Sequence, residues 1–337
     1  MADFEDDSIN MNTDDEHMEA ILSDLMQIKG VGKTQAEKLY NAQLYSIEQI
    51  ASMPIPALME RTGFNKAAAQ KLIDNAKPLC DLGGILSGTE VFHTEEGRKF
   101  LRTGSRAIDE LIGGGYPVGL ISEIHAENGM GKSQSCFTAS VMATLPESEG
   151  GLDGHVIYID TEGTFDAHRI AQIAEARGYD PQEVLSRVHV ARVMTSSQQV
   201  LIMDKVNELA TQIPIRLVIV DSIMARFRTD FAGGRQNLPE RQGMMGQHLS
   251  DLLSFATRNK AVILVTNQVS AVPDANPLFG PTVMACGGHV LGHACAVRMM
   301  IRRGKAGTRI IKLMKSNCMP VGEAPCTLDI RGIGDKE

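Results

Sequence analysis

The chain has 337 residues and a formal net charge of −8, and 43% of its residues are hydrophobic. This length is enough for two domains, and the composition is ordinary for a globular protein. No apolar run approaches about 18 residues and the start of the chain is acidic, which argues against a membrane span and a signal peptide. The six cysteines form no C-x-x-C pair, which favours free thiols in a protein that is not secreted.

Acidic residues are concentrated at the start of the chain. The first 19 residues contain eight Asp or Glu and no Lys or Arg, so the rest of the chain has no net charge. A run of like charge with few apolar residues cannot build a core, so we expect a disordered acidic tail over residues 1–18. Alternatively, the tail screens a basic surface until DNA displaces it. Net charge therefore does not decide whether the protein binds nucleic acid.

Residues 19–78 are predicted to form a small all-α domain. Its glycine turn at residues 30–32 precedes a helix with Ala36, Leu39 and Tyr40 on one face. The pattern resembles a helix-hairpin-helix, whose turn N–H groups contact a DNA phosphate without reading sequence. A helical packing module that never touches DNA is the alternative, and both interpretations remain open.

A second turn and helix are expected over residues 63–72. Pro78, paired glycines at 83–84 and Gly88 follow, and they predict a linker over residues 79–100. The remaining residues, 101–337, are expected to form one large domain.

The large domain contains a phosphate-binding loop pattern. An apolar-rich strand over residues 120–125 leads into residues 126–133, and a helix follows. The loop fits G-x-x-x-x-G-K-[ST] except that Ala126 replaces the first glycine. The alanine fits only if this position does not require a positive φ angle. A glycine-rich turn that binds no nucleotide is the alternative interpretation.

Four residues of this loop have expected roles. Gly129 and Gly131 allow backbone N–H groups to converge on an anion at the start of a helix. Lys132 would reach the β- and γ-phosphates of a nucleotide, and Ser133 would hold Mg²⁺.

Three further apolar runs, at residues 155–159, 217–220 and 261–265, are separated by segments of helix length. This alternation predicts an α/β fold with a doubly wound, mostly parallel sheet. Each run ends in polar residues, and in such sheets the site lies at the carboxyl ends of the strands.

The polar strand ends supply three candidate site residues. Asp221 would bind Mg²⁺ through water, although it could instead cap a helix. Glu162 could orient water for in-line attack on the γ-phosphate. Gln268 suits a sensor of the γ-phosphate, although a buried amide bonded to backbone is the alternative.

Several segments closely resemble the RecA-like strand-exchange recombinases, above all archaeal RadA and the eukaryotic mitotic and meiotic recombinases. The resemblance spans roughly residues 20–337 and is carried by residues 158–165, 221–225, 228–233, 266–269, 287–293 and 332–335.

The resemblance implies a RecA-like P-loop ATPase core behind a helix-hairpin-helix domain. It implies a filament of this chain on single-stranded DNA that exchanges strands with duplex DNA in homologous recombination and double-strand-break repair. ATP and Mg²⁺ would be the cofactors, mediator proteins are possible partners, and the location would be cytoplasmic in an archaeon or nuclear in a eukaryote.

The resemblance also implies residue roles. Glu162, Gln268 and Lys132 would be catalytic. The nucleotide would contact Glu127, Asn128, Gly129, Met130, Gly131, Lys132, Ser133, Gln134 and Arg169 of one subunit, and His293, Lys315 and Pro320 of the next.

Two loops are expected to meet DNA. The first, residues 224–244, combines arginines and phenylalanines that suit a surface following phosphates: Arg226, Phe227, Arg228, Phe231, Arg235 and Arg241. A solvated basic loop is the alternative. The second, residues 270–286, has Phe279 but no Lys or Arg.

The chain departs from the family at two functional positions. Ile85 and Gly88 stand where relatives have the Phe-x-x-Ala that docks onto the next subunit, so self-assembly is expected but weaker. Lys315 replaces an aspartate that relatives associate with monovalent or divalent cations, so we expect less dependence on potassium or calcium. Seven basic residues and no acidic ones between 298 and 315 predict a basic hairpin, facing either DNA or solvent.

Three other functions are alternatives to strand exchange. A regulatory paralogue would bind ATP and DNA without exchanging strands, and Ala126 and the altered linker keep it open. A hexameric helicase or clock-type ATPase is disfavoured by the helix-hairpin-helix domain, and a plain DNA-binding module by Glu162 with Gln268.

Overall fold

The computed structural model describes residues 18–19, 21–80, 85–232, 237–271 and 283–336. The chain divides into two compact units, Met1–Phe92 and His93–Glu337. Most of the predicted acidic tail and the paired glycines at 83–84 lie outside the described residues.

The first unit is helical, as predicted. Its elements are α2 (Lys33–Asn41), α3 (Ile47–Ser52), α4 (Ile55–Thr62), α5 (Lys66–Ala76), the short 3-10 turn η1 (Lys77–Leu79) and the start of α6 (Gly88–Glu96). Ala36 and Leu39 are fully buried and Tyr40 packs against the same core, which confirms the predicted apolar face of α2.

Two glycine turns shape this unit. Gly30 has a φ of +92° in the turn before α2, and Gly63 ends α4 with a φ of +67°. Both angles favour glycine because a side chain there would be strained. Asn65 then accepts a hydrogen bond from the N–H of Ala68 at 2.9 Å and starts α5, so the predicted second turn and helix are present.

The helix α6 lies within the predicted linker, between the end of η1 at Leu79 and the start of β1 at Phe100. Ser87 accepts a bond from the N–H of Glu90 at 3.2 Å, and the Glu90 carboxylate accepts one from the N–H of Ser87 at 2.6 Å. This reciprocal arrangement is a capping box that starts a helix. Ile85, just before it, is fully exposed.

The second unit is built on a ten-stranded sheet, as counted over the described residues, beside a two-stranded one. Six neighbours, β9-β3-β7-β6-β4-β5, run parallel, and β10, β11, β12 and β8 are antiparallel. The strands are β1 (Phe100–Leu101), β2 (Tyr116–Pro117), β3 (Ile121–Ala126), β4 (His155–Asp160), β5 (Val188–Arg192), β6 (Ile215–Asp221), β7 (Val262–Ala271), β8 (Val283–Ala285), β9 (Val297–Arg303), β10 (Arg309–Lys315), β11 (Gly322–Asp329) and β12 (Gly332–Gly334).

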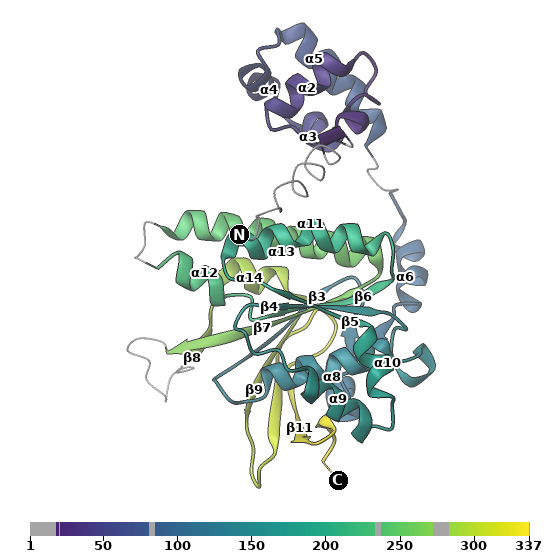
Figure 1. Cartoon of the computed structure of the whole chain (residues 1–337), viewed down its shortest axis with the longest axis vertical. Coiled ribbons are helices and arrows are strands. Elements are labelled where there is room, and N and C mark those ends of the chain that lie inside the picture. The colour runs from purple at the N-terminus through teal and green to yellow at the C-terminus, as the bar shows by residue number, and fades with distance from the viewer. Residues whose placement is uncertain (1–17, 20, 81–84, 233–236, 272–282, 337) are drawn as a thin grey trace, which may run out of the picture. The chain divides into compact units, whose positions relative to one another are not determined.

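Helices cover both faces of this sheet: α8, α9 and α10 lie on one face and α11, α12, α13 and α14 on the other (Figure 1). The elements are α7 (Arg106–Ile112), α8 (Lys132–Thr144), η2 (Glu147–Glu149), α9 (Ala167–Ala176), α10 (Pro181–Ser186), α11 (Ser196–Ala210), α12 (Ala225–Asp230), α13 (Leu238–Asn259) and α14 (Gly288–Ala294). The predicted doubly wound, mostly parallel α/β fold is confirmed.

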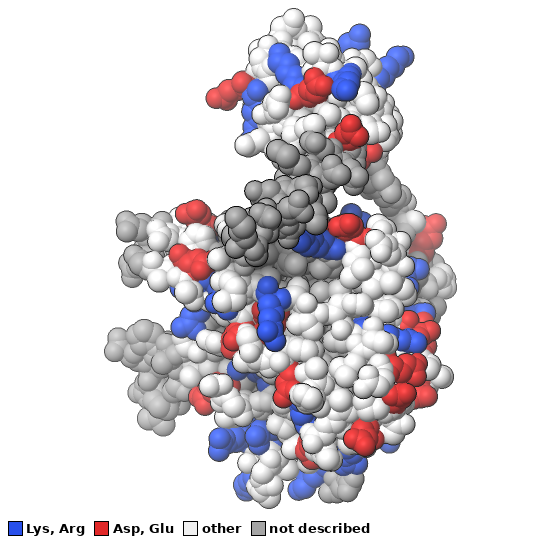
Figure 2. All heavy atoms as spheres, viewed as in Figure 1, with Lys and Arg blue, Asp and Glu red and all other residues white. Residues whose placement is uncertain are grey.

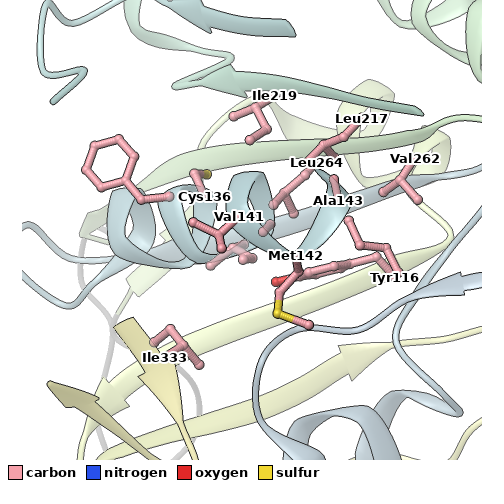
Figure 3. Packing of buried hydrophobic residues seen from close by; sticks show 14 of the residues in the cluster. Tyr116, Cys136, Val141, Met142, Ala143, Leu217, Ile219, Val262, Leu264 and Ile333 are labelled. Atoms are coloured by element: carbon pink, nitrogen blue, oxygen red, sulfur yellow. The ribbon is translucent and has the colours of Figure 1, made fainter. Parts of the chain in front are cut away.

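Helix α8 lies at the centre of one of the two apolar cores of the second unit. Residues 135–144 are all buried, and a helix that is buried on every side needs small side chains such as Cys136 and Ala143. Figure 3 shows α8 packed between Leu217 of the central sheet and Ile333 of β12. The helix that follows the phosphate loop is therefore fixed firmly in place.

The C-terminal segment closes the second unit. The Asp335 carboxylate accepts a hydrogen bond from the Ser105 hydroxyl at 2.6 Å and bonds from the N–H groups of Arg106 and Ala107 at 3.0 Å. It thereby caps the start of α7, where a negative charge is stabilising. Burial raises the pKa of Asp335, but the hydrogen bonds together lower it by more, so its pKa lies below the ordinary value.

Candidate nucleotide and DNA site

The phosphate loop begins at the carboxyl end of β3, between β7 and β9. Ala126 is the last residue of that strand and pairs with Gln268 of β7. Its φ is not positive, whereas Gly129 and Gly131 have φ of +72° and +114°. The alanine therefore fits its position, and the two glycines lie where the backbone requires them.

Lys132 opens α8 and reaches back across the loop. Its ammonium donates to the carbonyl oxygens of Ala126 and Glu127, each at 3.0 Å. Burial lowers the pKa of Lys132, while the nearby carboxylates of Asp221 and Glu162 oppose that change. The ammonium and two carboxylates therefore meet at one end of the sheet, where a nucleotide's phosphates would be bound.

Asp221 ends β6 and is buried. One carboxylate oxygen accepts a hydrogen bond from the Tyr158 hydroxyl at 2.6 Å, and the other accepts one from the Thr266 hydroxyl. Each oxygen keeps a lone pair, which fits a water-bridged Mg²⁺. The alternative of a helix cap is wrong, because Met224 occupies that position of α12 and no side chain caps it.

Asp160 organises the turn that presents Glu162. Its carboxylate accepts hydrogen bonds from four successive backbone N–H groups at 2.8–3.2 Å, those of residues 162–165. The sequence had marked Asp160 only as a polar strand end. Its position directly after a buried strand was the available signal for this anchoring role.

Glu162 and Gln268 lie side by side, as their places at two strand ends predicted. One oxygen of Glu162 accepts from the Ser222 hydroxyl at 2.7 Å and from the Gln268 side-chain amide at 3.0 Å. The carbonyl oxygen of that amide accepts from Arg228 of α12 at 2.8 Å. The alternative of an amide satisfied by backbone is therefore wrong.

These residues border a pocket of about 480 Å³. It is lined by Thr161, Glu162, Ala225, Arg226, Arg228, Thr229 and Gln268. The pocket thus joins the candidate catalytic glutamate to the helix that carries the predicted DNA-binding arginines.

A second polar network lies beneath the phosphate loop. Glu123 is completely buried and pairs with Arg298 of β9. It also accepts a hydrogen bond at 2.8 Å from Asn267, which donates to the carbonyl of Cys286 at 2.7 Å. The Nδ1 atom of His125 lies 4.0 Å from the same carboxylate, and burial lowers the pKa of this histidine. This network was not predicted from the sequence.

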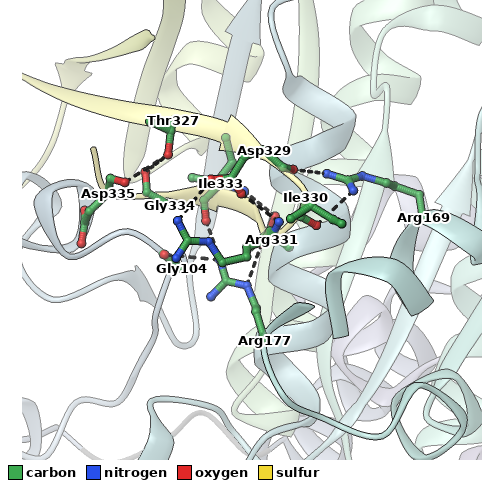
Figure 4. Close-up of polar contacts among 11 residues, drawn as sticks. Gly104, Arg169, Arg177, Thr327, Asp329, Ile330, Arg331, Ile333, Gly334 and Asp335 are labelled. Carbon is green, nitrogen blue, oxygen red and sulfur yellow. Dashed lines mark hydrogen bonds and ion pairs between the residues drawn. The ribbon is translucent and has the colours of Figure 1, made fainter. Parts of the chain in front are cut away.

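Arg169, expected near the nucleotide base, binds the end of the chain. It donates to Gln134 at 2.8 Å and to the backbone carbonyls of Asp329 and Ile330 (Figure 4). Arg177 donates in the same way to the carbonyls of Arg331 and Ile333. The place of Arg169 next to Gln134 of α8 keeps it close to the phosphate loop.

The predicted DNA-binding residues of the first loop do not share one environment. Arg228 is exposed, while Arg226 and Arg241 are half-buried on α12 and α13. Phe227 is fully buried, so its prediction as a DNA-binding residue is wrong. Because α12 is a helix rather than an open loop, one of its faces must enter the core.

Phe231 is half-buried, with its ring stacked on that of Phe227 at a centroid distance of 6.5 Å. Phe231 therefore also serves packing within the domain. Arg235 and Phe279 lie outside the described residues.

Lys315 ends β10 and caps the C-terminal end of α14. Its ammonium donates to the carbonyls of Gly292, His293 and Cys295 at 2.9, 3.3 and 2.8 Å. A cation at the C-terminal end of a helix is favourable. His293 and Pro320 are both exposed, so either side chain can contact a neighbouring subunit.

The predicted basic hairpin is present as β9 and β10, and four of its seven basic side chains have partners within the protein. Arg298 pairs with Glu123, Arg302 with Glu323, and Arg309 donates to the carbonyl of Met130 in the phosphate loop at 3.1 Å. Lys315 caps α14. Arg298, Arg309 and Lys315 are therefore neither DNA-facing nor merely solvated, whereas Arg302 forms its ion pair at the surface.

Charges of both signs are mixed over the face of the second unit that Figure 2 shows, and acidic side chains gather on the side that α10 covers. This face is therefore not a uniformly positive surface. No helix in the described part of the chain is long and apolar enough to span a membrane.

A P-loop sheet that brings a lysine, a buried aspartate and a glutamate–glutamine pair together, behind a helical module, defines a RecA-like ATPase. The chain belongs to the Rad51 family, whose model matches residues 98–336, and a model described as a SAM-like Helix-hairpin-helix tandem matches residues 22–77. The protein is accordingly a recombination-related, DNA-binding ATPase that binds ATP.

Proposed function

We propose that this protein is an ATP-dependent strand-exchange recombinase that forms filaments on single-stranded DNA. The observation that carries the proposal is the run of side-chain contacts Glu162–Gln268–Arg228. It links the candidate hydrolytic group to the helix with the arginines, so that a change at Arg228 on DNA binding would reach Glu162.

In this proposal, the loop amides around Gly129 and Gly131 and the ammonium of Lys132 hold the phosphates of ATP. The ammonium would exchange its two bonds to loop carbonyls for bonds to phosphate oxygens, which carry a full charge. Ser133 and, through water, Asp221 would hold Mg²⁺, which neutralises phosphate charge when it is bound.

Glu162 orients the attacking water. The turn held by Asp160 and the hydroxyl of Ser222 fix its carboxylate, and one of its oxygens has no hydrogen-bond partner among the described residues. Phosphoryl transfer demands mainly positioning and charge neutralisation, which these groups supply. Gln268 responds to the γ-phosphate through its side-chain N–H.

Assembly places part of the next subunit over the nucleotide. His293, Lys315 and Pro320 would face the neighbour's ATP, and Ile85 with Gly88 would dock one subunit on the next. The full exposure of Ile85 supports this role, because an exposed apolar side chain gains by burial in a partner's pocket. Arg226, Arg228, Arg235, Arg241 and Phe279 would meet DNA.

Strand exchange tests the proposal directly. The protein is placed on a labelled single strand with ATP and Mg²⁺ and is offered homologous or heterologous duplex. Exchange with the homologous duplex alone, abolished by Lys132→Ala, is the expected result. ATP turnover and DNA binding without exchange would favour the regulatory paralogue instead, and would direct attention to Ile85 and Gly88.

A further inference from the structure

Both ends of the Gln268 side-chain amide have partners inside the protein. Its Nε2 atom donates to Glu162 at 3.0 Å, and its Oε1 atom accepts from Arg228 at 2.8 Å. A phosphate oxygen at physiological pH only accepts hydrogen bonds, so Gln268 can contact a γ-phosphate only through Nε2. In the arrangement observed, one N–H of Nε2 is donated to Glu162, and the Arg228 contact at Oε1 holds the plane of the amide in that orientation.

We propose that Arg228 is a positioning residue that holds Gln268 turned toward Glu162 until DNA binds. A DNA phosphate would compete for the Arg228 guanidinium, and the released amide could then rotate toward the γ-phosphate. This rests on the proposed function in one respect, that DNA is the ligand of Arg228.

The chemistry of the contact favours such an exchange. A guanidinium binds a phosphate through charge-assisted, often bidentate, hydrogen bonds, whereas the Gln268 oxygen is a neutral acceptor. Arg228 is exposed, so the contact with Gln268 is made in water and is weak. The contact between Arg228 and a DNA phosphate is therefore more favourable in free energy than the contact with Gln268 that it replaces.

The helix that carries Arg228 is anchored by other residues. Phe227 is fully buried, and the Asp230 carboxylate accepts bonds from the N–H and the hydroxyl of Ser196 at 2.6 and 2.7 Å. Release of Arg228 therefore leaves α12 in place. Gln268 is equally fixed in its backbone, since its carbonyl accepts from the N–H of Cys286 at 3.0 Å. The moving parts are two side chains.

Steady-state ATP turnover without DNA tests the proposal. Arg228→Met keeps the length of the side chain but removes its donors, and we expect kcat in the absence of DNA to rise about fivefold with little change in KM for ATP. Saturating single-stranded DNA should add little further stimulation. Arg228→Lys, which can still donate to Gln268, should restore most of the low DNA-free rate.

Arg258→Met is the matched control, because it removes an exposed arginine of α13 that bonds only to Ser254 and Asn207 among the described residues. Its DNA-free turnover should equal that of the wild type. A DNA-free kcat of Arg228→Met that is unchanged or lower would overturn the proposal and leave Arg228 as a DNA contact alone.

Arg228→Ala is the second variant should the methionine variant prove unstable, and the same outcomes apply to it. These measurements need no strand exchange. A protein that fails to exchange strands but gains DNA-free turnover on substitution of Arg228 would refute the proposed function and retain this inference.

Discussion

Asn267 and Gln268 are neighbours on β7, yet they belong to opposite kinds of polar network. Successive residues of a strand point to opposite faces of the sheet. Asn267 reaches the buried ion pair of Glu123 and Arg298, and Gln268 reaches the exposed Glu162 and Arg228. Each network joins one amide, one carboxylate and one guanidinium.

The difference between the two networks is their contact with water. A buried carboxylate depends on its partners, because an unpaired charge in the interior is very unfavourable, whereas exposed groups can exchange protein partners for solvent or ligand. The comparison teaches that the same three chemical groups hold strands together where they are buried and can rearrange where they are exposed.

The largest effect is expected from breaking the buried network. Glu123→Ala leaves the guanidinium of Arg298, which is mostly buried, without its carboxylate, so we expect the free energy of unfolding to fall by about 3–5 kcal/mol. Urea denaturation of the wild type and the variant measures this loss of stability. Glu123→Met combined with Arg298→Met should recover most of that loss, and a loss below about 1 kcal/mol in the single variant would contradict the assignment.

His248 provides a second test of the cost of a buried charge. It is fully buried on α13 and neither ring nitrogen has a hydrogen-bond partner among the described residues. Burial lowers its pKa to about 4, so between the ordinary value of about 6.5 and pH 4 the unfolded chain binds the proton more readily. Stability is thus lost as pH falls, by about 3 kcal/mol at pH 4.

The variant His248→Leu isolates this contribution. Its stability relative to the wild type should increase as pH falls from 7 to about 4, as followed by denaturant unfolding at each pH. If the difference in free energy of unfolding between the two proteins stays constant over that range, His248 takes up its proton as readily in the folded protein as in the unfolded chain.

On the exposed side, Glu162→Gln should change activity rather than stability. The amide retains the acceptor for Ser222 but loses the charge that orients water, so kcat for ATP should fall about 100-fold. The free energy of unfolding should stay within about 0.5 kcal/mol of the wild type. Nucleotide binding, measured by calorimetry, should persist, and its loss would indicate a different role for Glu162.

The smallest expected effect concerns Lys315, whose charge is fixed by three carbonyls at the end of α14. Wild-type turnover should be similar in sodium and potassium salts. Lys315→Asp should acquire a potassium dependence of about fivefold, equal to about 1 kcal/mol. A strict potassium requirement of the wild-type protein would refute the idea that the lysine supplies the positive charge.

The parallel sheet and the position of the site were predictable from the sequence because the relevant signals are local. Apolar runs that end in Asp160, Asp221 and Gln268 indicate buried strands and the edge at which their ends meet. The strand β5 was not predicted, since Val188–Arg192 alternates apolar and polar residues over only five positions.

The side-chain networks could not be predicted because their members are far apart in the chain. Asn267 and Arg298 lie 144 and 175 positions from Glu123, and only the folded sheet brings them together. Phe227 shows a different limit: a segment interpreted as a loop contains a helix, and periodicity then decides which aromatic ring is buried.

The cap that Asp335 places on α7 has a consequence for biosynthesis. The first helix of the large unit is completed by a carboxylate 230 positions further along the chain, so the ribosome delivers the two partners at opposite ends of this unit's synthesis. The ATPase fold therefore cannot finish while its last residues are still being translated, because contacts of such long range form late. Until Asp335 has left the ribosome, α7 lacks this cap.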